Sequence, residues 1–285
     1  MTQKSEIEQQ LCLESELARR LLEADENTRA KLYGPAYDQI YEISLRGRGP
    51  KAEDQQFGSG PYMFPILTRL SRPGDQVLEV GCGCGYLSLE LARSGRQVTG
   101  VDVSSVAIEQ AQRHAERFPS AGAPDFVCVS GLELPFPFNS FDLVFSVEVL
   151  EHLHEADVPR YLAGAFRVLR PGGRFWVKTP NRLLDISAEE RFGVDDRSHH
   201  HGDNPNVHLK EWTYAELMPL LEQAGFRDLS SFWQRPSINF FPRLPARVKL
   251  NAERALRWLP FTRVRRLLMY QARVGDISIV GRKPT

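Results

Sequence analysis

Short apolar runs alternate with amphipathic stretches through the middle of the chain. Seven of these runs have the length of a strand, near residues 76–80, 97–102, 125–129, 141–147, 174–179, 228–233 and 276–282. Helical periodicity separates several of them; after Asp102, apolar residues recur on one helical face from Ala107 to Phe118. Because strands that alternate with helices indicate parallel βαβ units, we predict an α/β fold with a doubly wound sheet. Its ligand loops should lie at the carboxyl ends of the strands.

The segments on either side of this core differ from it in composition. Residues 5–32 carry charged helix formers with leucines at near-helical spacing, which predicts one or two helices outside the core. Residues 33–57 are rich in Gly, Tyr and Arg, and we expect them to wrap toward the ligand crevice. The predicted organisation is an N-terminal helical cap (1–58), a core (59–239), a basic amphipathic helical insertion (240–274) and a last core strand with the C-terminus (275–285).

The insertion mixes apolar and aromatic side chains with nine arginines and lysines. Such a stretch can lie peripherally on an anionic membrane or hold a lipid-linked substrate. It can also cover the active site, form a dimer face or pack as an ordinary helix. Pro242, Pro245 and Pro260 do not suit one long surface helix, which favours ordinary packing.

Composition narrows the class of protein. The chain has 285 residues, with 36 basic and 36 acidic side chains, so no global field favours a polyanionic partner. Cys82 and Cys84 alternate with glycines and lack a second pair for zinc, and neither they nor Cys12 and Cys128 suggest a disulfide framework. The N-terminus is polar and no apolar run reaches the length of a membrane span, so we expect a cytoplasmic location.

The most informative motif joins the first two predicted strands. Residues 77–85 read VLEVGCGCG and lead into a helical pattern. Gly81, Gly83 and Gly85 let a ligand approach the backbone closely, because glycine has no Cβ. Asp102 ends the next strand and offers a carboxylate suited to a ribose diol. Together they predict a nucleotide-like cofactor.

Glycine spacing distinguishes between cofactors. The dinucleotide fingerprint is G-x-G-x-x-G, whereas the spacing here is G-x-G-x-G after an acid, Glu79. Three further motifs follow in order: LPFPFNSFDLV at 134–144, FRVLRPGG at 166–173 and LEQAGF at 221–226. The set resembles the class I S-adenosylmethionine (SAM) methyltransferases. That family implies a Rossmann-like sheet of seven strands with the last one antiparallel.

The resemblance also implies how the cofactor is held. Asp102 would accept hydrogen bonds from the ribose hydroxyls, and Glu79 would orient the ammonium of the amino-acid tail. Relatives often carry an aspartate near adenine where this chain has Ser130, so its contact would run through hydroxyl or backbone. The full set of expected cofactor-binding residues adds Gly81, Cys82, Gly83, Gly85, Val103, Gly131, Leu132 and Val147.

A candidate metal site follows the fourth strand. If a helix begins there, Glu148, Glu151 and His152 share one face at i, i+3 and i+4. With His208, which precedes Trp212, they resemble the metal-binding set of the small-RNA 3′-terminal 2′-O-methyltransferases. Ubiquinone-pathway O-methyltransferases carry a similar set at another spacing. Carboxylates and imidazoles suit Mg²⁺, Mn²⁺ or Zn²⁺, any of which would lower the pKa of a bound hydroxyl.

The same residues also permit an interpretation that involves no metal ion. Acids in a first helical turn stabilise the helix dipole, and His152, with Glu148 beside it, could act as a general base. Asn181 after the fifth strand and His201 in a polar loop are candidate substrate contacts. The alternative roles are a cap for the next turn and a solvated loop.

We therefore predict a SAM-dependent methyltransferase that methylates a hydroxyl of a small molecule, of diol or catechol type. One rival is metal-dependent 2′-O-methylation of an RNA 3′ end, which the neutral net charge disfavours because RNA-binding surfaces are basic. Another is a pseudo-enzyme that binds SAM as a regulatory ligand. A dinucleotide oxidoreductase fits the glycine spacing least well.

Overall fold

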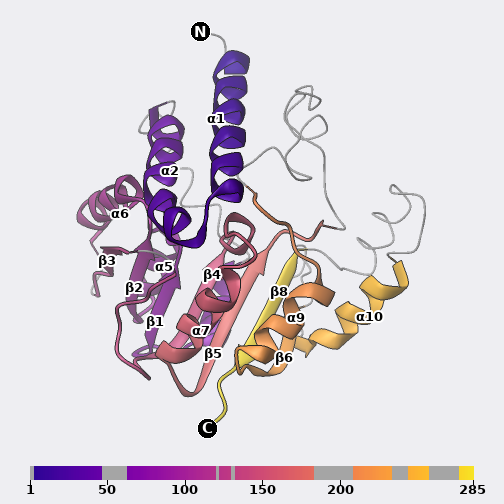
Figure 1. Cartoon of the computed structure of the whole chain (residues 1–285). Coiled ribbons are helices and arrows are strands. Elements are labelled where there is room, and N and C mark those ends of the chain that lie inside the picture. Colours follow the sequence, from indigo (N-terminus) through magenta and orange to yellow (C-terminus); the bar gives the residue numbers. More distant parts are fainter. Residues whose placement is uncertain are drawn as a thin grey trace.

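The computed structural model describes residues 3–46, 63–119, 122–129, 132–182, 208–232, 243–256 and 276–285 (Figure 1). Its strands are β1 Gln76–Val80, β2 Gln97–Asp102, β3 Asp125–Cys128, β4 Phe141–Val147, β5 Leu169–Thr179, β6 Arg227–Phe232, β7 Arg243–Pro245 and β8 Ile277–Arg282. They form one sheet in the order β3-β2-β1-β4-β5-β8-β6-β7.

Strand direction confirms the predicted topology. The pairs β1–β2, β2–β3, β1–β4 and β4–β5 are parallel. The last strand in the chain, β8, is antiparallel to both β5 and β6. The short strand β7 adds an eighth, antiparallel edge beside β6. It is missing from the prediction because its three residues, Arg-Leu-Pro, contain no apolar run.

The helices are α1 Gln3–Glu23, α2 Glu26–Arg46, α4 Met63–Leu70, α5 Tyr86–Arg93, α6 Ser105–Arg117, α7 Val158–Val168, α9 Tyr214–Gln223 and α10 Ala246–Leu256, with a 3₁₀ turn, η1, at Leu150–His152. Local capping fixes two of the starts. The Ser104 side chain accepts from the Ala107 N–H at the start of α6, and Thr213 and Glu216 form a capping box at α9.

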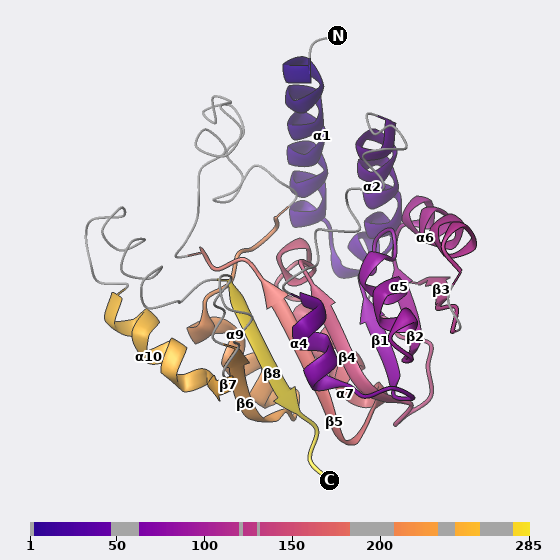
Figure 2. The same cartoon turned by 180° about the vertical axis from the view of Figure 1, so that it is seen from behind.

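Two apolar layers bury the faces of the sheet. Leu78 and Val80 of β1 pack toward α7 and α9, whereas Val77 packs toward α4 and α5. Figure 2 shows α4 and α5 in front of the sheet. Covered on both faces, the central strands read as continuous apolar runs rather than alternating ones.

The N-terminal helices lie above the edge where the parallel strands end (Figures 1 and 2). That edge is where open α/β sheets bind ligands. The helix pair therefore stands over the expected ligand crevice. In the described part of the chain, none of the helices combines the length and apolar character needed to span a bilayer.

Candidate active site at the carboxyl edge of the sheet

The glycine loop between β1 and α5 is shaped by close packing. Gly81, Gly83 and Gly85 all have positive φ. A Cβ on Gly81 would stand 2.3 Å from Val149 Cγ2, and one on Gly85 would stand 2.5 Å from the Phe126 ring. The loop can therefore approach its neighbours only because these positions lack side chains.

Asp102 ties this loop to the end of β2. Its carboxylate accepts hydrogen bonds from the backbone N–H groups of Gly83 and Ser104, both at 2.9 Å. The side chain is only 8% exposed, and burial raises the pKa of its carboxyl group. Each carboxylate oxygen still has a lone pair for a further donor, such as a ribose hydroxyl.

A cavity of about 120 Å³ opens beside Asp102. Its lining comes from α2, the ends of β1 and β2, the segment after β4, and α7. The residues are Tyr33, Tyr37, Tyr41, Val80, Gly81, Val101, Asp102, Val103, Leu132, Glu148, Val149, His152, Leu153 and Tyr161. Six of the predicted site residues, Gly81, Asp102, Val103, Leu132, Glu148 and His152, thus surround one space.

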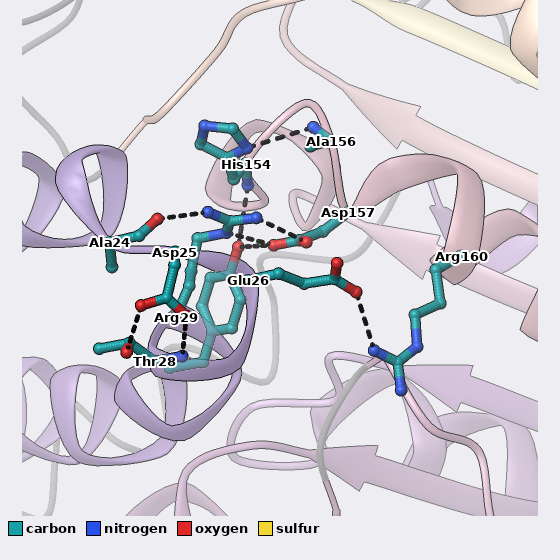
Figure 3. Close-up of polar contacts among 10 residues, drawn as sticks. Ala24, Asp25, Glu26, Thr28, Arg29, His154, Ala156, Asp157 and Arg160 are labelled. Carbon is teal, nitrogen blue, oxygen red and sulfur yellow. Dashed lines mark hydrogen bonds and ion pairs between the residues drawn. The ribbon is translucent and has the colours of Figure 1, made fainter.

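A buried ion pair holds α2 against the segment that follows β4 (Figure 3). Arg29 donates to both carboxylate oxygens of Asp157, at 2.6 and 2.9 Å, and the two side chains are 4% and 2% exposed. The Tyr33 hydroxyl donates to Asp157 and accepts from the His154 N–H, both at 2.9 Å. Burial acts to raise the pKa of Asp157, but the Arg29 and Tyr33 hydrogen bonds outweigh it and lower that pKa. The predicted wrapping of the Tyr-rich segment toward the crevice thus holds for the part that forms α2.

The backbone after β4 differs from the predicted helix. Glu148 has a φ of 55°, and only the single 3₁₀ turn η1 follows it. Glu148, Glu151 and His152 therefore do not share one face of a helix. The left-handed backbone conformation of Glu148 at the end of β4 prevents a helix from starting there. The Glu148 carboxylate instead pairs with Lys178 of β5, which also contacts Asp276 at 2.8 Å.

Three of the four predicted metal ligands nevertheless converge. One ligand atom each from Glu151, His152 and His208 lies within 4.8 Å of the others. The Leu209 and Lys210 N–H groups donate to the Glu151 carbonyl oxygen, at 2.7 and 3.2 Å, and so join the two segments. Glu148 is outside this group but lies close enough that its charge adds to the raised pKa of Glu151.

The chemistry of this donor set fits a divalent cation. Glu151 is fully buried, and burial raises the pKa of its carboxyl group well above the usual range. Its Oε2 accepts from Thr179 at 2.8 Å, while Oε1 has no hydrogen-bond partner among the described residues. A buried carboxylate without a counter-charge is costly, and a metal ion supplies that charge.

The other predicted site residues lie outside the cavity lining. Glu79 is buried below the glycine loop, where it accepts a 2.5 Å hydrogen bond from Ser88. Val147 packs toward α4. Asn181 is buried, forms an isolated bridge with Trp212 and hydrogen-bonds Glu253 of α10. The remaining predicted loop residues are Cys82, Gly83 and Gly85, which shape the loop, and Ser130, Gly131 and His201, which lie outside the described residues.

Sequence reasoning missed several polar groups around the cavity. Glu211 Oε1 lies 3.0 Å from His208 Nδ1 and so orients that ring. The spacing of three residues in His-Leu-Lys-Glu was the available signal. Tyr33, Tyr37 and Tyr41 recur every four residues on one helical face, a second signal that could have identified a cavity wall.

Comparison with known proteins agrees with this geometry. Residues 78–177 match the family model described as a methyltransferase domain. A SAM-dependent methyltransferase of Mycolicibacterium smegmatis is 37% identical over 153 residues, which cover 54% of this chain and 52% of that protein. A ubiquinone biosynthesis O-methyltransferase of Rhizobium rhizogenes is 36% identical over 144 residues, 50% of this chain and 53% of that protein. The chain spans about half the length of the curated relatives it matches.

A solved structure shows the same fold at lower identity. The methyltransferase partner of the Haloferax volcanii Trm112 methyltransferase activator is 22% identical, with a TM-score of 0.56. The match covers 87% of this chain and 99% of that one. Residues 78–177 thus match a methyltransferase domain, and the glycine loop, the acid that ends β2 and the strand order agree with the class I SAM-dependent methyltransferases that the chain resembles.

Proposed function

We propose that the protein transfers the SAM methyl group to a hydroxyl of a small molecule that carries two adjacent oxygens, a diol or a catechol. A divalent cation, Mg²⁺, Mn²⁺ or Zn²⁺, would be held by Glu151, His152 and His208. The observation that carries the proposal is the convergence of these three ligand atoms beside the cofactor cavity. The name of the similar ubiquinone biosynthesis O-methyltransferase supports a hydroxyl acceptor.

Neighbouring side chains orient each candidate metal ligand. Thr179 donates to one oxygen of Glu151 and leaves the other available. The rings of His152 and His208 meet edge to face, with centroids 5.0 Å apart. Glu211 accepts from or donates to His208 Nδ1 according to the protonation of the pair, and thereby fixes the ring. Such partners orient ligands and raise their basicity.

Methyl transfer from a sulfonium is an in-line displacement, so the enzyme mainly has to align the nucleophile with the methyl carbon and exclude water. Asp102, Glu148 and His152 all line the cavity. Asp102 would hold the cofactor ribose, and Glu148 and His152 would face the acceptor. A bound cation would lower the pKa of the acceptor hydroxyl and so favour the nucleophilic alkoxide or phenolate. Lys178 holds Glu148 in place at the cavity wall.

The test begins with metal content. Purified protein is analysed for bound metals, stripped with a chelator and assayed with a catechol and with the matching phenol. We expect loss of activity on stripping, recovery with Mg²⁺, Mn²⁺ or Zn²⁺, and methylation of the catechol but not of the phenol, which offers one oxygen. Full activity after stripping would contradict the metal role and leave His152 as the candidate base.

A variant sharpens this test. Glu151→Gln removes the buried carboxylate charge but preserves shape, so we expect catalytic activity to fall about 1,000-fold, since metal assistance contributes several kcal/mol. Binding of S-adenosylhomocysteine (SAH), the demethylated cofactor, should change less than about twofold, because this ligand does not need the cation. Methylation of a short RNA with a 3′-terminal diol, in place of the catechol, would favour the RNA alternative instead.

A further inference from the structure

The polar lining of the cofactor cavity is acidic. Asp102 and Glu148 contribute carboxylates, and no lysine or arginine is among the described residues that line it. The amino-acid tail of SAM is a zwitterion. Its carboxylate needs a hydrogen-bond donor and would be repelled by the Asp102 and Glu148 carboxylates. The neutral hydrogen-bond donors that line the cavity are therefore the candidates for binding the SAM carboxylate.

Two tyrosines one turn apart on α2 differ in how their hydroxyls are used. The Tyr33 hydroxyl donates to Asp157 and accepts from the His154 N–H. The Tyr37 hydroxyl is buried and makes no hydrogen bond within the described part of the chain. A tyrosine hydroxyl is a neutral hydrogen-bond donor near neutral pH, because its ordinary pKa is about 10.

The surroundings of Tyr37 locate its hydroxyl. Its ring meets that of His152 edge to face, with centroids 5.6 Å apart. Tyr37 lines the same cavity as Asp102 at the end of β2 and His152 after β4. Gly81, at the start of the glycine loop where the tail of the cofactor is expected, lines this cavity as well.

Leaving a buried hydroxyl without a hydrogen-bond partner destabilises a protein by about 1–3 kcal/mol. Buried hydroxyls in folded proteins therefore nearly always have a partner, which can be a bound ligand. We propose that the Tyr37 hydroxyl donates a hydrogen bond to the carboxylate of the cofactor's amino-acid tail. The N-terminal cap would then supply a binding residue from outside the matched domain, residues 78–177. The inference rests on SAM binding and is independent of the acceptor and of the metal.

The experiment compares Tyr37→Phe with Tyr214→Phe by calorimetry, using SAH and 5′-methylthioadenosine, which lacks the amino-acid tail. Tyr214 is buried outside the cavity lining, and its hydroxyl accepts from the Ser278 N–H at 3.1 Å. A hydrogen bond to a charged group contributes about 1.5–3 kcal/mol, so Tyr37→Phe should weaken SAH binding about 10- to 100-fold. Binding of methylthioadenosine should stay within about twofold, because the affected contact is absent from that ligand.

Thermal unfolding without ligand gives a second readout. Tyr37→Phe should unfold at the same or a higher temperature than wild type, because it removes an unsatisfied hydroxyl. Tyr214→Phe should unfold at a lower temperature and keep SAH affinity, because it removes a hydrogen-bonded hydroxyl outside the cavity. Unchanged SAH binding in Tyr37→Phe, or an equal loss for both ligands, would overturn the proposal. So would a tail-specific loss in Tyr161→Phe alone, since that cavity-lining hydroxyl also lacks a hydrogen-bond partner in the described residues. Neither assay contains an acceptor or a metal, so failure here is distinct from failure of the proposed function.

Discussion

The cofactor half of the site, from β1 to the start of α6, and the acceptor half, at the end of β4, differ in how their polar groups are paired. In the cofactor half, Asp102 accepts from two backbone N–H groups, and the Gly81 and Cys82 N–H groups both donate to the Val101 carbonyl. In the acceptor half, Glu151 Oε1 has no such partner in the described structure.

The two halves therefore differ in whether local or long-range contacts stabilise them. The cofactor half is stabilised by bonds within one stretch of about 25 residues, from Val80 to Ser104. The acceptor half combines α2, η1 and the segment at His208, and leaves buried polar atoms that a ligand or ion would satisfy. It therefore depends on long-range contacts that hold those pieces together.

The largest expected effect comes from breaking one such contact, the ion pair between Arg29 and Asp157 (Figure 3). Arg29→Met leaves the Asp157 carboxylate buried without its partner, which typically lowers the free energy of unfolding by about 3–5 kcal/mol. Chemical denaturation measures this loss. The double variant with Asp157→Leu should recover much of it, because the uncompensated charge is then gone.

Arg19→Met is the matched control on α1. Arg19 pairs with Glu16 and Glu23 on the surface, where its side chain is 41% exposed. Exposed pairs of this kind contribute about 0–1 kcal/mol. Equal small losses in Arg29→Met and Arg19→Met would show that the acceptor half does not depend on the buried pair.

A smaller effect is expected in the cofactor half. Asp102→Ala removes the acceptor for the ribose hydroxyls, and we expect SAH binding to weaken about 10- to 100-fold, since each hydrogen bond to a charged group contributes 1.5–3 kcal/mol. Calorimetry measures the affinity. Metal content should not change, because Asp102 is outside the group of candidate ligands.

Asp102→Asn separates binding from folding in this half. The amide retains one oxygen for the Gly83 or Ser104 N–H but has no charge. Its unfolding temperature should therefore lie nearer that of wild type than the value for Asp102→Ala. SAH affinity unchanged in both variants would refute the ribose role of Asp102.

The cofactor half was predictable because it is local. Val77-Leu78-Glu79-Val80 and the spaced glycines define a strand and a turn within ten residues, and Asp102 ends the next apolar run. The parallel units followed from the βαβ pattern, and the antiparallel last strand followed from the family resemblance. The sequence carried no pattern that predicts β7.

The acceptor half was predictable only as a set of residue types. Glu151, His152 and His208 were identified from their chemistry, but helical spacing does not bring them together; the backbone bonds from Leu209 and Lys210 to Glu151 do. Such tertiary contacts leave no periodic trace in a sequence. The same holds for Arg29 with Asp157, which are separated by 128 positions.

The most selective effect concerns Glu79, the buried acid of the cofactor half. Burial, with a smaller contribution from the charge of Asp102, raises its pKa to about 8, although the Ser88 hydroxyl partly opposes the shift. The folded state therefore keeps a proton that the unfolded state, with an ordinary pKa near 4.5, releases, so stability should fall as pH rises from about 4.5 to 8. The slope from one group is at most about 1.4 kcal/mol per pH unit. Glu79→Gln should remove this part of the pH dependence, and Glu116→Gln on the exposed surface should not.

If the ammonium of the cofactor tail lies near Glu79, SAH binding at pH 7 should release up to one proton in wild type and none in Glu79→Gln. Calorimetry in two buffers of different ionisation enthalpy measures that release, and equal values in both proteins would contradict the ammonium contact.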